Sequence, residues 1–286
     1  MSTAAQHWLT LAPAAAIVLY FVVGMIAFTV RTAIWGLSHD RDIEASGRSI
    51  LIGVYLRNYF SWVIRPLWLL VNASGISPNA VTVLATMVGV GSGAAAATGH
   101  FALAGWLFIL SGILDTLDGK LARVRNRVTR AGAAFDSLLD RYADGAVLVG
   151  LAFYFRNSWA LIPALAALFG TSMVPYVRAK AESFGVTMKE GLMQRPERVF
   201  TLGIAVMMSP FVEALLPSAG GHSPQRLAAI GLVLLAVTSN TTAIGRIARL
   251  LTALREQARA SAATGAPVPG QPRTSPSTAR ARLVRT

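Results

Sequence analysis

The sequence predicts an all-α protein that crosses a membrane several times, and three observations carry this prediction. Hydrophobic residues make up 54% of the 286 residues and charged residues only 14%, whereas soluble domains carry about 25% charged residues. Several apolar stretches are about 20 residues long, which is the length that a helix needs to cross the hydrocarbon core of a bilayer. The 26 Lys and Arg residues outnumber the 13 Asp and Glu residues and give a net charge of +13. In so apolar a chain, this charge favours anionic lipid or a phosphorylated substrate, and we expect no nucleic-acid partner.

The chain contains no cysteine. This composition excludes disulfides, cysteine-ligated zinc, iron–sulfur clusters and thiol nucleophiles. Any metal in this protein must therefore be held by oxygen or nitrogen ligands.

The first segment, residues 1–36, is expected to be a transmembrane helix separate from the rest. Residues 1–30 contain no Lys, Arg, Asp or Glu, and the run over 11–30 is apolar. A secretory signal would place a basic region before a shorter apolar run, and neither feature is present. We expect a helix that starts outside, exits at Arg31 and is followed by a polar linker over 37–50.

Residues 51–75 are expected to form an amphipathic helix that lies in the membrane interface. The stretch mixes arginines with aromatic residues such as Trp68, which favour the level of the lipid headgroups. Pro66 is expected to break or kink this helix, because proline removes a backbone donor and clashes with the preceding turn. Ser77 is a candidate N-cap for the next helix, with Pro78 in its first turn.

Six further spans complete a domain over 76–255. They are expected at about 79–98, 101–122, 133–155, 158–180, 197–217 and 227–250. Basic residues gather after the second and fourth of these spans and at the end of the last, while each opposite connection carries one arginine at most. The positive-inside rule then puts the basic loops and the C-terminus in the cytoplasm. The tail over 256–286 is rich in Ala, Pro, Ser and Thr, cannot bury a core and is expected to be disordered.

Five of the thirteen acidic residues fall within thirty positions, at the end of one expected span and the start of the next: Asp115, Asp118, Asp136, Asp140 and Asp144. One ionised Asp in a membrane helix costs about 2.5–3.5 kcal/mol, so such a group needs a cationic partner. Asp115 and Asp118 are three apart and share one helical face, and Asp136 and Asp140 are four apart and share another. A short loop between two antiparallel helices can bring these faces together.

Carboxylates with no His or Cys nearby form a set of hard oxygen ligands, which suits Mg²⁺ or Mn²⁺ rather than zinc. Two such ions about 3.5–4 Å apart form the clamp that is used for displacement at phosphorus. The alternative is the proton or cation pathway of a transporter, in which acids also gather. A cation-coupled transporter predicts repeated halves with matching broken helices, whereas this sequence carries a single acidic cluster.

The residues between the acids fit a phosphate-binding site. Small residues, Gly119, Ala122 and Gly132, lie about one turn from the acids, where they let a ligand approach closely. Arg123 is near enough to reach a phosphate bound at the metals. Residues 115–140 read DTLDGKLARVRNRVTRAGAAFDSLLD and match D-x2-D-G-x2-A-R-x8-G-x3-D-x3-D at every fixed position. With this motif, the chain resembles the CDP-alcohol phosphotransferases over about residues 52–250.

The resemblance implies a six-helix CDP-alcohol phosphotransferase core with an interfacial amphipathic helix, to which this chain adds the N-terminal transmembrane helix. It implies transfer of a phosphatidyl group from CDP-diacylglycerol to an alcohol, with release of CMP, by a homodimer that holds two Mg²⁺ or Mn²⁺ ions per active site. The residue roles that it implies are metal ligation by Asp115, Asp118, Asp136 and Asp140, general-base catalysis by Asp140, and a CDP-lipid pocket of Gly119, Ala122, Arg123 and Gly132.

A second group of basic residues bears on the acceptor alcohol: Arg178, Arg195, Arg198 and Arg246. A basic pocket beside a metal site favours a phosphorylated acceptor, because Arg binds phosphate through two parallel hydrogen bonds. Ordinary positive-inside charge is the alternative explanation.

The runs YVRAKAE and RPER, together with DRYADGAV at 140–147, look like the bacterial phosphatidylinositol-phosphate synthases of this family. This likeness implies that inositol 1-phosphate is the acceptor and that the four arginines bind its phosphate. It also implies the bacterial inner (cytoplasmic) membrane, with the active site facing the cytoplasm. The first basic position is typically Lys in that group and is Arg178 here. Glycerol 3-phosphate, which would yield phosphatidylglycerophosphate, is the alternative acceptor.

Overall fold

The computed structural model describes residues 3–36, 54–188, 195–216 and 225–264, and within these ranges it contains nine helices and no strand. The helices are α1 (Thr3–Trp35), α3 (Val54–Val63), α4 (Arg65–Ala73), α5 (Pro78–Ala97), α6 (Phe101–Val124), α7 (Arg130–Tyr154), α8 (Leu161–Ser183), α9 (Arg195–Leu215) and α10 (Arg226–Thr264). The expected all-α fold is confirmed. The expected linker over 37–50 lies outside the described residues.

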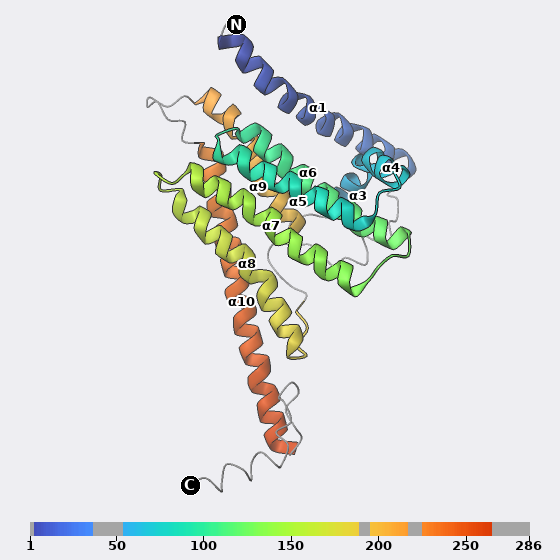
Figure 1. The fold of residues 1–286 in the computed structure, drawn as a ribbon, viewed down its shortest axis with the longest axis vertical. Helices are drawn as coiled ribbons and strands as arrows, with labels where there is room; N and C mark the ends of the chain where they lie inside the picture. Colours follow the sequence, from blue (N-terminus) through green and yellow to red (C-terminus); the bar gives the residue numbers. More distant parts are fainter. Residues whose placement is uncertain (1–2, 37–53, 189–194, 217–224, 265–286) are drawn as a thin grey trace.

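Six of the helices form a closed ring in which each packs against two neighbours. The order around the ring is α5, α6, α9, α10, α8, α7 and back to α5. The two helices that carry the acids, α6 and α7, also touch each other. Figure 1 shows α5, α6 and α7 side by side, while α10 runs at an angle to them and extends beyond the bundle. This ring is the expected six-helix core.

Five of the ring helices, α5, α6, α8, α9 and α10, are long and apolar enough to cross a membrane. They make the chain an integral membrane protein and agree with five of the seven expected spans. The 25-residue α7 packs in the same ring, but its Asp and Arg residues make it too polar for the same criterion. The 33-residue α1 includes the apolar run over 11–30, but its crossing is not tested over the described residues. The count of seven crossings therefore stays a prediction.

Close packing of the ring depends on small residues. A Cβ atom at Gly150 of α7 would collide with the backbone of Gly93 on α5, and a Cβ atom at Gly93 would collide with the carbonyl of Ala146. Membrane helices approach each other through such small residues, because lipid provides no hydrophobic drive for their association. The ring also buries an apolar core that includes Phe101 and Leu151, each at most 1% exposed.

The extra N-terminal helix is held to the rest of the protein by aromatic packing. Phe28 of α1 is 1% exposed, and its ring contacts the rings of Tyr59 and Trp62 on α3. The hydroxyl of Tyr59 donates a hydrogen bond to the carbonyl of Phe21. These contacts join α1 to α3, and α1 also touches α6 of the ring.

The expected interfacial helix is divided in two, as Pro66 predicts. The first half, α3, ends at Val63 and the second, α4, begins at Arg65 with Pro66 in its first turn. Ser77 caps α5 as expected, since its hydroxyl accepts a hydrogen bond from the backbone N–H of Ala80 at 3.3 Å.

Lys120 of α6 and Arg125, the residue directly after α6, hold the segment around α4. Arg125 donates through Nη2 to the carbonyl of Asn72 at 2.9 Å and through Nη1 to the carbonyl of Ile76 at 2.6 Å. The Nζ atom of Lys120 lies 5.2 Å from the centroid of the Trp68 ring, within the range of a cation–π interaction. The interfacial helix is thereby anchored to the helix that carries the first two acids.

The last helix extends further than the sequence pattern predicts. Its span was expected to end at 250 and the disordered tail to begin at 256, but α10 continues to Thr264. The expectation of disorder is therefore wrong over 256–264. The reason is local, because the run REQARASAA over 255–263 consists mainly of strong helix formers. Residues 265–286 lie outside the described residues.

Candidate active site

The acidic cluster forms where α6 ends and α7 begins. The chain reverses its direction between Val124 and Arg130. Thr129 fixes the start of α7, because its hydroxyl accepts a hydrogen bond from the backbone N–H of Gly132 at 3.0 Å, which is the geometry of an N-cap. The acids near the end of α6 and those near the start of α7 therefore lie at the same end of the helix pair.

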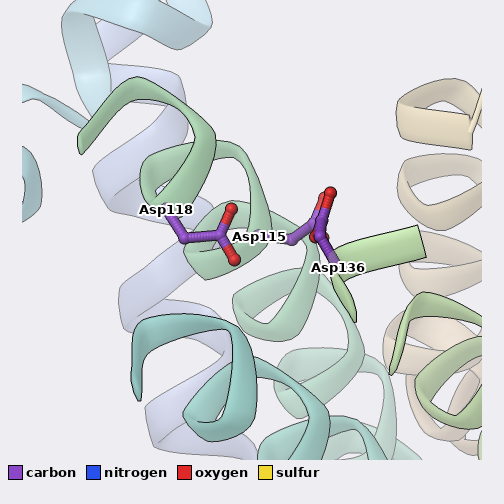
Figure 2. Close-up of side chains that lie close together, drawn as sticks. All are labelled: Asp115, Asp118 and Asp136. Atoms are coloured by element: carbon purple, nitrogen blue, oxygen red, sulfur yellow. The ribbon is translucent and has the colours of Figure 1, made fainter. Parts of the chain in front are cut away.

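Three carboxylates converge at this end. Figure 2 shows Asp115 and Asp118 of α6 beside Asp136 of α7, and one oxygen of each lies within 4.8 Å of the others. Asp118 is only 4% exposed. Asp118 Oδ2 and Asp136 Oδ1 are buried and have no hydrogen-bond partner among the described residues. Buried carboxylate oxygens that lack a donor fit a hard divalent cation, so these three residues could hold a metal ion.

The other two acids of the cluster, Asp140 and Asp144, share one guanidinium with Asp115. Arg195, the first residue of α9, forms a close ion pair through Nη1 with Asp115 Oδ2. Its Nη2 lies 2.9 Å from Asp140 Oδ1 and 3.3 Å from Asp144 Oδ1, and its Nε donates to Asp144 Oδ2 at 3.3 Å. The four side chains are about one-fifth exposed. Arg195 thus supplies the cationic partner that a buried acidic group requires.

The remaining predicted acceptor residues differ in their surroundings. Arg198, one turn further along α9, is buried, and its Nε has no partner among the described residues. Arg246 of α10 donates through Nη1 to the carbonyl of Val174 at 2.8 Å. Arg178 of α8 is exposed and pairs with Glu182 at 2.9 Å. The charged neighbours of Arg198 include Asp144, Arg195 and Arg246, and those of Arg246 include Arg178.

The predicted nucleotide-binding residues lie along α6 and in the first turn of α7. A Cβ atom at Gly119 would meet only Arg123 Nη1, at 3.6 Å, so the space beside Gly119 is otherwise open. Ala122 is half-buried on the same helix. A Cβ atom at Gly132 would lie 3.0 Å from Thr129 Oγ1. The glycine at 132 therefore leaves room for the Thr129 hydroxyl that caps α7.

Two residues of α5 join the site without any signal in the sequence. Thr82 lies beside the carboxylate of Asp118, and its hydroxyl donates to the carbonyl of Pro78 at 3.1 Å. Asn79 lies near Gly132, since a Cβ atom there would be 3.7 Å from Asn79 Oδ1. Polar residues in the first turns of a helix are common, and only the packing of α5 against both α6 and α7 brings these two to the acids.

Comparison with known proteins identifies the family. The model of the CDP-alcohol phosphatidyltransferase family matches residues 75–239. The chain is 34% identical over 223 residues to the phosphatidylinositol phosphate synthase of Streptomyces avermitilis, which covers 76% of this chain and 88% of that protein.

Solved structures agree with this result. The crystal structure of the Mycobacterium tuberculosis phosphatidylinositol phosphate synthase with CDP-DAG bound superposes with a TM-score of 0.56 at 28% identity, over 65% of this chain and 92% of that one. The structure of that enzyme in complex with manganese and citrate has the same TM-score and identity, over 65% and 88%. The chain therefore belongs to the CDP-alcohol phosphatidyltransferase family and is a membrane-embedded transferase, as the motif over 115–140 indicates.

Proposed function

We propose that this protein transfers the phosphatidyl group of CDP-diacylglycerol to inositol 1-phosphate and releases CMP. The observation that carries the proposal is the convergence of Asp115, Asp118 and Asp136 within a sequence that keeps every fixed position of the family motif. The names of the relatives, which are phosphatidylinositol phosphate synthases, favour a phosphorylated inositol as acceptor.

Asp115, Asp118, Asp136 and Asp140 would hold two Mg²⁺ or Mn²⁺ ions. The buried oxygens of Asp118 and Asp136 that lack donors support this assignment, and a relative that crystallises in complex with manganese supports the choice of metal. Such ions, when bound, would neutralise the diphosphate and stabilise the leaving CMP.

The chain's own residues would orient both substrates and move one proton. The acceptor hydroxyl attacks the phosphorus that carries the diacylglycerol, one P–O bond forms, and the P–O bond to CMP breaks. Asp140 would take the hydroxyl proton as general base. Gly119, Ala122, Arg123 and Gly132 would line the pocket for the cytidine diphosphate, which the open space beside Gly119 favours.

The arginines would bind the phosphate of the acceptor. The unpartnered Nε of Arg198 is a buried donor beside the acids, and Arg195 reaches the acids directly. Arg246 and Arg178 extend the positive charge away from them. A phosphate dianion is the ligand that such a set of guanidinium groups favours. Free inositol, which carries no charge, would gain nothing from them.

We further propose that the protein is a homodimer in the bacterial inner membrane, with the acidic end facing the cytoplasm and seven crossings. The basic residues gather in the connections on one side of the expected spans, and this distribution supports the proposed orientation. Because the chain lacks cysteine, single cysteines at Ser2 and Ser275 can be labelled from either side of the membrane. Labelling of both positions from the same side would contradict an odd number of crossings.

An acceptor screen tests the proposed reaction. Purified protein with CDP-diacylglycerol and Mg²⁺ would be offered inositol 1-phosphate, inositol, glycerol 3-phosphate or serine, and CMP release would be measured. We expect release with inositol 1-phosphate that EDTA abolishes. Release with glycerol 3-phosphate instead would make the protein a phosphatidylglycerophosphate synthase. CMP release unaffected by EDTA would contradict the metal centre.

A further inference from the structure

We propose that Arg195 is an internal counter-cation of the acidic cluster. A divalent metal must displace the Arg195 guanidinium from the acids before Arg195 can bind the acceptor phosphate. The proposal deepens the function proposed above and rests on it. It gives Arg195 two positions, one against the acids in the metal-free protein and one against the acceptor in the loaded protein.

The contacts of Arg195 carry the argument. Its guanidinium lies against three carboxylates from two different helices, those of Asp115, Asp140 and Asp144. Three of its nitrogen atoms take part, Nε, Nη1 and Nη2. A planar guanidinium with five N–H donors can bridge several carboxylates in this way from three different nitrogen atoms, whereas the three donors of a lysine share one nitrogen. The same side chain therefore neutralises a large part of the acidic cluster.

Two of these three carboxylates belong to the proposed metal ligands. The oxygen atoms of Asp115 and Asp140 that face Arg195 belong to carboxylates that a divalent cation would also bind, so the cation and the guanidinium compete for the same negative charge. Asp140 also has to receive the proton of the acceptor hydroxyl, and its Oδ1 faces the guanidinium at 2.9 Å. Both roles therefore favour withdrawal of Arg195 from these two residues.

Asp144 provides an anchor for this movement. It contacts Arg195 through both of its oxygens, at 3.3 Å from Nη2 and 3.3 Å from Nε. Asp144 has no place among the proposed metal ligands, so its contact with Nε can persist when the other contacts are lost. This assigns a positioning role to the one acid of the cluster that the proposed reaction does not use.

Arg198 marks the direction in which Arg195 would turn. It lies one helical turn along α9, is 8% exposed and keeps a buried Nε without a partner among the described residues. A buried N–H donor is normally paired with a hydrogen-bond acceptor. A phosphate placed between Arg195 and Arg198 would satisfy it and would hold Arg195 away from Asp115 and Asp140.

The arrangement predicts a fixed order of binding. Without metal, Arg195 is occupied by the acids and contributes nothing to the acceptor phosphate. Metal binding releases it, so metal and phosphate should strengthen each other's binding, and this coupling must be reciprocal.

The first test measures metal affinity without any turnover. The full-length protein in detergent would be titrated with Mn²⁺ and the free ion followed by EPR, in the wild type and in Arg195→Gln. Loss of the competing guanidinium should tighten Mn²⁺ binding by about tenfold, the size of one charge-assisted hydrogen bond. Arg198→Gln is the matched control, because it removes the same charge from the next turn, near Asp144, without removing any hydrogen bond or ion pair to the acids that the described residues contain.

Unchanged or weaker Mn²⁺ binding by Arg195→Gln, or equal tightening by Arg198→Gln, would overturn the proposal. Arg195→Lys should bind Mn²⁺ more tightly than the wild type although the charge is kept. A wild type that binds no Mn²⁺ would instead contradict the proposed function itself, so the two failures are distinguishable.

The second test measures inorganic phosphate binding by calorimetry, with and without Mn²⁺. Arg195→Gln should leave phosphate affinity unchanged in the metal-free protein and weaken it by about tenfold in the Mn²⁺-loaded protein. Asp144→Asn should weaken phosphate binding only with Mn²⁺ as well, because Arg195 then loses its anchor. If Arg195→Gln weakened phosphate binding equally in both states, Arg195 would not be held by the acids, and the proposal would fail.

Discussion

The two ends of the helix pair α6 and α7 contrast sharply. At one end, the pair contributes Phe101, Leu148 and Leu151 to an apolar core in which each is at most 1% exposed. At the other end, the same two helices carry five acids, of which Asp118 is nearly as deeply buried. The apolar end is stabilised by packing alone. At the acidic end, some carboxylate oxygens have no donor within the part of the chain that the structure describes, and Arg195 of a third helix contacts the acids.

This contrast indicates how the work is divided within one pair of helices. A buried charge opposes folding, so the acidic end contributes little to stability and is retained for its chemistry. The apolar end and the glycine contacts between α5 and α7 hold the helices together. Substitutions at the two ends should therefore separate activity from stability.

The largest effect is expected from the acids themselves. Asp115→Asn, Asp118→Asn and Asp136→Asn should each lower kcat/KM by at least about 100- to 1,000-fold, because an amide is a poor ligand for a hard cation and transition-state charge is then left uncompensated. Thermal melting of the metal-free protein should stay the same or rise for Asp118→Asn and Asp136→Asn, since a buried charge is removed without breaking an ion pair of Arg195. The increase in Tm that Mg²⁺ gives the wild type should disappear. Near-normal turnover in any of the three would contradict the metal site.

The second-largest effect is expected on the KM values of the two substrates, which should respond to different arginine substitutions at the acidic end. Arg195→Ala or Arg198→Ala should raise the acceptor KM by about 10- to 150-fold, the equivalent of about 1.5–3 kcal/mol for a hydrogen bond to a charged group. Arg123→Ala should instead raise the KM of the CDP-lipid. Kinetics with each substrate varied separately decide between these outcomes. Unchanged acceptor KM and kcat in both Arg195→Ala and Arg198→Ala would remove the case for a phosphorylated acceptor.

Packing between α5 and α7 gives a third, smaller effect, on stability rather than chemistry. Gly150→Ala should destabilise the protein by about 1–3 kcal/mol, because the added methyl group meets backbone atoms of Gly93 that cannot move aside. Gly145→Ala is the control on the same helix, since its nearest neighbour would be Leu168 Cδ1 at 3.9 Å. Thermal melting in detergent should fall for the first variant and be unchanged or slightly higher for the second. Equal melting of the two would mean that α5 and α7 are less closely packed.

The smallest effect is expected at the interfacial helix. Arg125→Ala removes two hydrogen bonds to the carbonyls of Asn72 and Ile76, which are exposed to solvent and contribute about 1 kcal/mol together. Amide hydrogen exchange should become faster over 72–77 and stay unchanged in α5. The exposed Arg127 provides a control, because Arg127→Ala removes the same charge two residues away. Faster exchange in both variants would assign the effect to charge rather than to these hydrogen bonds.

Local features of the fold could be read from the sequence. Pro66 predicts the break between α3 and α4, and Ser77 predicts the cap of α5, because both effects depend on neighbouring backbone groups alone. The end of α10 was misjudged, since low hydrophobicity after residue 255 indicated a tail although helix propensity favoured continuation to Thr264.

By itself, the sequence determined the class of protein, the apolar spans and the acids of the candidate metal site. These depend on composition and on spacing within one or two helices, and a spacing of three or four residues fixes which side chains share a face. Only the tertiary structure decided that Arg195 lies against Asp115, Asp140 and Asp144, and that Thr82 lies beside Asp118. Arg195 is 80 residues from Asp115 in the chain, and no local pattern records such a distance. The contact between Arg195 and the acids is set by the packing of α9 and α5 against α6. This packing places a cation beside the buried acids.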